Sequence, residues 1–96
     1  MRKITEQISN SFLNKKSRKI GNSETDGRNF WLHREKIAKF DDDGFLWISN
    51  AGYPSNTTKE RLNSLPCVRI HQKNFVWYLN NQAWGGEWVK TEFKRD

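Results

Sequence analysis

Few residues in this sequence have the types and spacing that catalysis or metal binding requires. His33 and Glu35 lie two positions apart, with Pro66 and Cys67 downstream, which matches half of the signature of zinc-dependent deaminases. Ile70 stands where the second cysteine ligand of that signature would be. Because a zinc ion needs three or four protein ligands at a recognised spacing, we expect no metal site.

Cys67 and His71 come nearest to a pair of nucleophile and base. Their even spacing places them on one face of a strand, but two alternations apart and with no acid nearby in the sequence to orient the histidine. Residues 41–44 (DDDG) lack the ligand spacing of a calcium loop and indicate a hairpin turn. The sequence therefore predicts no catalytic residue, no metal, no cofactor and no enzymatic activity.

Basic side chains provide a different kind of chemistry. The net charge is +6, and residues 1–20 hold six basic side chains against Glu6 alone. Such a cluster either complements the negative end of a helix dipole or attracts a polyanion or an acidic protein surface. The candidate basic contacts are Lys15, Lys16, Arg18 and Lys19 in this cluster, and Lys59, Arg61, Arg69 and Lys73 further along the chain.

Aromatic residues are the strongest positive signal, because they make up 14% of the chain and include five tryptophans. Strand alternation would put large apolar groups on both faces of a sheet. Either the sheet curls into a half-barrel that buries both sets, or one face stays exposed and stacks nucleic-acid bases or forms the centre of a protein interface or homodimer. The candidate aromatic contacts are Trp31, Trp47 and Trp77, near Lys39, Arg69, His71 and Lys73.

The elements that must position these residues follow from periodicity. Ile4, Ile8 and Phe12 recur every four residues, which predicts an amphipathic helix from residue 3 to about 15 that docks on the rest of the protein. Residues 21–27 (GNSETDG) have the composition of a loop. Short strands are then expected at 29–33, 36–40 and 45–49.

A second helix and a second strand group complete the pattern. Thr57 followed by Glu60 fits a capping box, and Leu62 with Leu65 gives a short apolar face. Pro66 cannot continue this helix. Strands are expected at 67–72, 75–80 and 87–93, so the fold class is α+β, with an antiparallel sheet of about five to six strands.

The chain length of 96 residues allows one domain. We divide it into a basic N-terminal helix (1–20), a first strand group (28–50), a short helix (57–65) and a second strand group (67–94). Cys67 is the single cysteine and is expected to be a buried small hydrophobe. No stretch has the apolar length of a signal peptide or a membrane span, so we expect a soluble intracellular protein that does not bind membranes.

From Ile20 onward the sequence resembles a group of small phage-encoded proteins. The resemblance rests on IGN, LHREKIAKF, DGFLWIS, TTKERLNSL, VRIHQKNFVWYLNN and WGGEW, and its most specific piece is residues 57–63 following the aromatic-centred turn at Tyr53 and Pro54. It implies a virus-encoded accessory protein that acts in the cytoplasm of a bacterial host. It brings no catalytic residues, and it does not cover residues 1–19.

Two functions are compatible with these features. The first is a non-enzymatic accessory protein that binds nucleic acid or a host nucleoprotein complex, with basic residues attracting the partner and aromatic residues contacting it. The alternative is a protein–protein inhibitor of a host enzyme or defence factor, which uses the basic helix to recognise an acidic groove.

Overall fold

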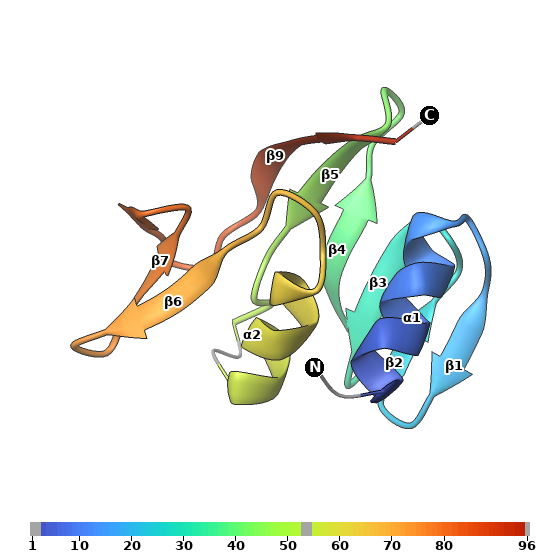
Figure 1. The fold of residues 1–96 in the computed structure, drawn as a ribbon, viewed down its shortest axis with the longest axis horizontal. Coiled ribbons are helices and arrows are strands. Elements are labelled where there is room, and N and C mark those ends of the chain that lie inside the picture. Colours follow the sequence, from blue (N-terminus) through green and yellow to red (C-terminus); the bar gives the residue numbers. More distant parts are fainter. Residues whose placement is uncertain (1–2, 53–54, 96) are drawn as a thin grey trace.

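The computed structural model describes residues 3–52 and 55–95 (Figure 1). The turn at Tyr53 and Pro54 lies outside the described residues. The elements, in chain order, are α1 (Lys3–Leu13), β1 (Arg18–Ile20), β2 (Ser23–Thr25), β3 (Asn29–Leu32), β4 (Glu35–Phe40), β5 (Phe45–Ile48), α2 (Asn56–Asn63), β6 (Ile70–Lys73), β7 (Val76–Leu79), β8 (Gln82–Ala83) and β9 (Val89–Lys94).

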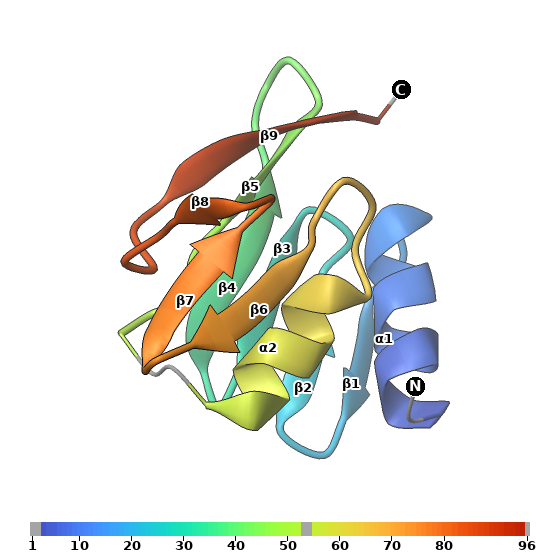
Figure 2. The same ribbon diagram turned by 60° about the vertical axis from the view of Figure 1, so that its left-hand side comes forward.

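The strands form two antiparallel sheets, which confirms the α+β class. One sheet has six strands in the order β1-β2-β3-β4-β5-β9, and the other has three in the order β6-β7-β8. The second strand group is therefore divided, because β9 leaves β8 and returns to pair with β5. β1 and β9 are the edges of the larger sheet, which is open and does not close into a barrel. Figure 2 shows β9 rising away from β8 to reach β5.

Residues 21–27 were expected to form a loop, but β2 occupies their centre. Ser23 and Thr25 are buried within this polar segment. The side chain of Thr25 donates to Asn29 O at 2.7 Å, and β2 pairs along its length with β3. Pairing with a neighbouring strand thus overrides a local composition that favours a turn.

The core joins α1 to the larger sheet through aromatic rings. Ile8 and Phe12 are fully buried, as their spacing predicts, and the Phe12 ring lies 5.3 Å from Phe30 and 4.8 Å from Phe40 between centroids. Ile4 is 40% exposed, so its inclusion in the docking stripe was wrong. Thr5 takes its place, because the buried positions also follow a three-residue step.

The N-terminal helix begins at Lys3 as predicted and ends two residues before the predicted end at about residue 15, so it covers only part of the basic segment 1–20. It ends at Leu13, and the backbone N–H of Lys16 donates to Ser11 O at 2.8 Å while Lys15 adopts a left-handed φ of 60°. Arg18 and Lys19 belong to β1 instead. The basic cluster is therefore a turn and an edge strand, not a helix face.

The central helix begins one residue earlier than expected. Ser55 is its N-cap, and its hydroxyl accepts from the backbone N–H of Thr58 at 3.1 Å, so the predicted cap at Thr57 was wrong. The helix ends at Asn63, with Ser64 as its C-cap. Leu62 and Leu65 are buried, as predicted for its apolar face.

Candidate nucleic-acid interface

One face of the six-stranded sheet carries aromatic rings and lysines on its middle strands. Along β3, Phe30 and Leu32 are buried against the helices, so Trp31 points to the opposite side. In β5, Leu46 and Ile48 likewise face inward. We call this opposite side the outer face; its residues are Trp31, Phe45, Trp47, Trp88, Lys36, Lys39, Lys90 and Lys94.

An irregularity in β4 places two lysines on this face. The register between β3 and β4 shifts at Phe30 and Trp31, and Ile37 and Ala38 are both buried. This bulge turns two successive side chains inward, so Lys36 and Lys39 both point outward although three positions separate them. Lys36 is opposite Trp31, and Lys39 is opposite Trp47.

Cation–π contacts join these lysines to the rings. The Nζ of Lys39 lies 4.8 Å from the ring centroid of Trp88 and 5.8 Å from that of Trp47. The Nζ of Lys36 lies 6.0 Å from the Trp31 ring. An ammonium within about 6 Å of a ring is attracted by the negative charge on the ring face.

The same pattern extends onto β9. The Nζ atoms of Lys90 and Lys94 lie 4.0 Å and 5.5 Å from the Phe45 ring centroid. Glu24, opposite Trp31 on β2, and the exposed Glu92 on β9 add negative charge at two positions. Four lysines outnumber these two carboxylates and that of Asp41, which bonds to Trp47, so the outer face carries net positive charge.

Asp41 fixes the orientation of the central tryptophan. Its Oδ2 accepts from Trp47 Nε1 at 2.8 Å, and its Oδ1 accepts from the backbone N–H groups of Asp43 and Phe45 at 2.9 Å each. The Trp47 hydrogen bond is the main reason that the pKa of Asp41 lies below its usual value. A ring held in this way is oriented before any ligand arrives.

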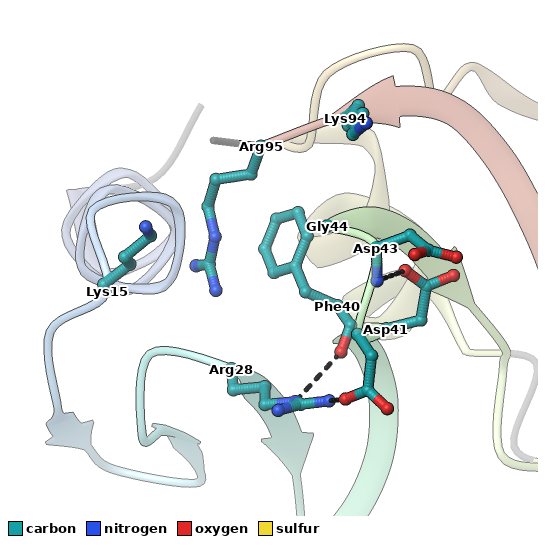
Figure 3. A pocket seen from close by; sticks show the side chains of 9 residues that line it. Lys15, Arg28, Phe40, Asp41, Asp43, Gly44, Lys94 and Arg95 are labelled. Atoms are coloured by element: carbon teal, nitrogen blue, oxygen red, sulfur yellow. Dashed lines mark hydrogen bonds and ion pairs between the residues drawn. The ribbon is translucent and has the colours of Figure 1, made fainter.

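A cavity of about 380 Å³ lies where the outer face meets the end of α1 (Figure 3). Arg95 extends between Lys15 and the Phe40 ring, with its guanidinium carbon 3.8 Å from the ring centroid. Its Nη1 donates to Phe12 O at 2.8 Å and to Gly27 O at 2.5 Å. Burial, followed by repulsion from Arg28, lowers the pKa of Arg95.

The charged residues around this cavity form ion pairs and hydrogen bonds that hold the end of α1 against the sheet. Arg28 pairs with Asp42 and also donates to Phe40 O at 3.2 Å. Three aspartates line the cavity with four cations, so its charges largely cancel. Arg95 satisfies a backbone carbonyl at the end of the helix, a role that basic side chains often have there.

The structure separates the basic residues predicted from the sequence. Lys15 lies at the cavity, and Lys16 is exposed in the turn that follows. Arg18 and Lys19 are exposed on β1, at the opposite edge of the sheet from β9. Charged side chains on an edge strand discourage pairing with another chain.

Two predicted contact residues are buried and so unavailable to a partner. Arg61 is 5% exposed, and it donates to Ser23 Oγ at 3.0 Å and Thr5 Oγ1 at 2.5 Å and pairs with Glu60 at 2.8 Å. Trp77 is 6% exposed and packs near Trp84. The causes differ, since Trp77 belongs to the hydrophobic core, whereas Arg61 is enclosed by hydrogen bonds to Ser23 and Thr5.

The remaining predicted residues lie around the smaller sheet. Lys59 on α2 has its Nζ 5.7 Å from the Trp77 ring centroid and donates to Gln72 Oε1 at 3.4 Å. Arg69 and Lys73 are exposed, before and at the end of β6. None of these three belongs to the outer face. Of the predicted contact residues, Trp31 and Trp47 do lie on that face.

Sequence reasoning missed much of the outer face: Phe45, Trp88, Lys36, Lys90 and Lys94. Alternation within 45–49 placed Phe45 on the same side as Trp47, which was the available signal. The lysines of β9 could not be assigned, because nothing local indicates that β9 pairs with β5.

The described residues also bear on Cys67, on metal binding and on membrane-spanning helices. Cys67 is exposed, with a φ of 62°, so its prediction as a buried residue was wrong. Within residues 3–52 and 55–95, no group of three or more His, Cys, Asp or Glu side chains lies close enough to hold a metal ion. In the same part of the chain, no helix is long and apolar enough to cross a membrane.

Comparison with known proteins gives the family of the chain. No curated protein and no solved structure matches it. The family model described as Kyanoviridae Gp96 protein matches residues 1–96. The resemblance to phage proteins seen from Ile20 onward therefore extends over residues 1–19 as well. The chain belongs to the Kyanoviridae Gp96 protein family, a family of phage proteins.

Proposed function

We propose that this phage protein is a non-enzymatic accessory protein that binds single-stranded nucleic acid on its outer face, in the cytoplasm of the host. The observation that carries the proposal is the alternation of rings and lysines across β3, β4, β5 and β9. Each of the four rings has a lysine Nζ between 4.0 and 6.0 Å from its centroid.

This arrangement supplies both contacts that a single strand needs. A base stacked on an aromatic side chain contributes about 1–3 kcal/mol with little dependence on its identity. The ammonium group that lies over the ring in the free protein would give way to the base and meet the phosphate that follows it. A duplex keeps its bases paired and stacked, so it would meet the lysines but not the rings.

The position of the face also supports the proposal. Phe12 of α1 packs on the inner side, against Phe30 and Phe40, and Arg61 of α2 bonds to Ser23 on that side. Neither helix therefore covers Trp31 or Trp47, which are partly exposed. The bond from Trp47 to Asp41 lowers the entropy cost of ordering that ring on binding.

The test measures the affinity of labelled single-stranded DNA and RNA by fluorescence anisotropy over a range of salt. Each engaged phosphate contributes about −0.7 to the slope of log affinity against log salt. Replacing Lys36, Lys39, Lys90 and Lys94 together with Gln should flatten this slope by about 3 units if all four are engaged. The binding of a single strand should also quench tryptophan fluorescence.

A matched control removes the same charge elsewhere. The variant with Lys15, Lys16, Arg18 and Lys19 changed to Gln keeps the outer face intact, and its slope should change much less. Equal flattening in both variants would show that net charge alone attracts the strand. Absence of binding to DNA and RNA at low salt would refute the proposal and favour a host protein as the partner of this face.

A further inference from the structure

Phe75 is the most exposed large apolar residue in the described part of the chain. It is 96% exposed at the tip of the β6–β7 hairpin, and its neighbour Val76 is 43% exposed. Figure 1 shows this hairpin projecting from the body of the protein. A phenyl ring in this position contributes nothing to the core.

The turn itself does not account for a phenylalanine. Asn74 and Phe75 have φ angles of 52° and 67°, so both central residues of the turn are left-handed. Two-residue turns of this kind favour Asn-Gly, because a bulky residue with positive φ is strained. His33 and Arg34 form a turn with similar φ angles, so the feature that distinguishes Phe75 is a large apolar side chain that is almost fully exposed.

The hairpin holds this ring on a rigid support. The rings of His71 and Tyr78 stack across the strands with centroids 5.1 Å apart. Asn63 of α2 donates to Ile70 O at 3.0 Å and accepts from Ile70 N at 2.6 Å. Because the hairpin is already ordered, less conformational entropy is lost when the Phe75 ring binds a partner.

A recess that fits a phenyl ring lies at the start of α2. It has a volume of about 260 Å³ and includes apolar side chains of Leu32, Ile37 and Ala51. A cavity of roughly 150 Å³ lined by apolar groups already binds benzene. The polar residues His33, Asn50, Ser55 and Thr58 complete its wall, and the exposed Glu35 also lines it.

The charges beside the ring and the recess are complementary. Lys73 stands two residues before Phe75 and is exposed, whereas Glu35 lies at the recess. Figure 1 shows the hairpin tip at the left end of the molecule, apart from the start of α2 and the β3–β4 turn. Because the tip projects from the body, a twofold axis would let the tip of each copy reach the recess of the other.

We propose that the protein forms a homodimer in which Phe75 of each copy fills the recess of the other and Lys73 pairs with Glu35 across the interface. The outer face contributes no residue to this contact. The dimer would carry two such faces, so the inference goes beyond the proposed function and does not depend on it.

The first test follows the monomer–dimer equilibrium by sedimentation velocity at several protein concentrations. Wild type should pass from monomer to dimer, and Phe75→Gly should weaken the dimer about a hundredfold to ten-thousandfold, because the twofold contact loses two buried apolar side chains, one from each copy. Asn-Gly suits this turn, so the melting temperature of the monomer should not fall. A wild type that stays monomeric at every concentration, or a dimer unaffected by the substitution, refutes the proposal.

The second test locates the contact by exchanging charges. Glu35→Lys should weaken the dimer, and adding Lys73→Glu to the same chain should restore it. Glu92→Lys is the matched control, since this exposed glutamate of β9 lies away from the recess. Failure of the double variant to recover would show that the ring does not enter this recess and would overturn the assignment.

Discussion

Trp47 Nε1 donates a 2.8 Å hydrogen bond to Asp41 Oδ2, which ties a ring of the outer face to the β4–β5 turn. Asp41 accepts from the backbone N–H of Phe45 as well, so one carboxylate orders both the turn and the side chain that follows it. The ionised carboxylate makes these bonds stronger than a neutral acceptor would.

Stability should depend on the charge of Asp41. Its folded pKa lies below the unfolded value of 3.8, mainly because of the Trp47 bond. The stabilisation is therefore complete above pH 3.8 and is lost as the pH falls through the folded pKa. Asp41→Asn should be less stable than wild type at neutral pH, and the gap in free energy of unfolding should close as the medium is acidified.

Urea titrations at several pH values measure that gap. Trp47→Phe should reduce the same pH dependence, because it removes the donor while keeping an aromatic ring. A gap between wild type and Asp41→Asn that is constant with pH would show that ionised Asp41 does not stabilise the turn.

The docking of α1 should depend on Phe12. Phe12→Ala should lower the free energy of unfolding by about 3–5 kcal/mol, because it removes a buried ring and leaves a cavity. Ile4→Ala is the matched control on the same helix and should cost much less, since Ile4 is 40% exposed. Chemical denaturation of the two variants measures both values, and equal losses would mean that α1 docks through a different stripe.

The start of α2 should depend on Ser55. Ser55→Ala removes the acceptor of the Thr58 N–H and should cost about 0.5–2 kcal/mol in the free energy of unfolding. Thr57→Ala, two residues later, should have a smaller effect because Thr57 is not the cap. Thermal melts of both variants compare them, and the reverse order would place the cap at Thr57.

Local patterns in the sequence were sufficient for most elements. The four-residue spacing of Ile8 and Phe12 predicted the buried side of α1, and alternation predicted β3, β4 and β5 within one or two residues. These signals work because each element buries its own apolar face. The spacing of apolar residues along the sequence therefore follows the period of the helix or strand. The α+β class followed from the order of these patterns.

The candidate site depended on contacts between distant parts of the chain. Nothing near residue 89 indicates that β9 leaves its neighbour and pairs with β5, which brings Lys90 and Lys94 to Phe45. The bulge that turns Lys36 and Lys39 outward likewise exists only in the register of β4 against β3. Arg61 looked like a surface cation until the fold placed Thr5 and Ser23 around it.

The sequence by itself therefore determined most of the elements, their order and the supply of aromatic and basic side chains, but not β1, β2 or β8. The tertiary structure decided which of those side chains are buried and which share a face. The physical reason is that periodicity records the burial of one element against its surroundings, whereas strand pairing across long separations is set by the packing of the whole core.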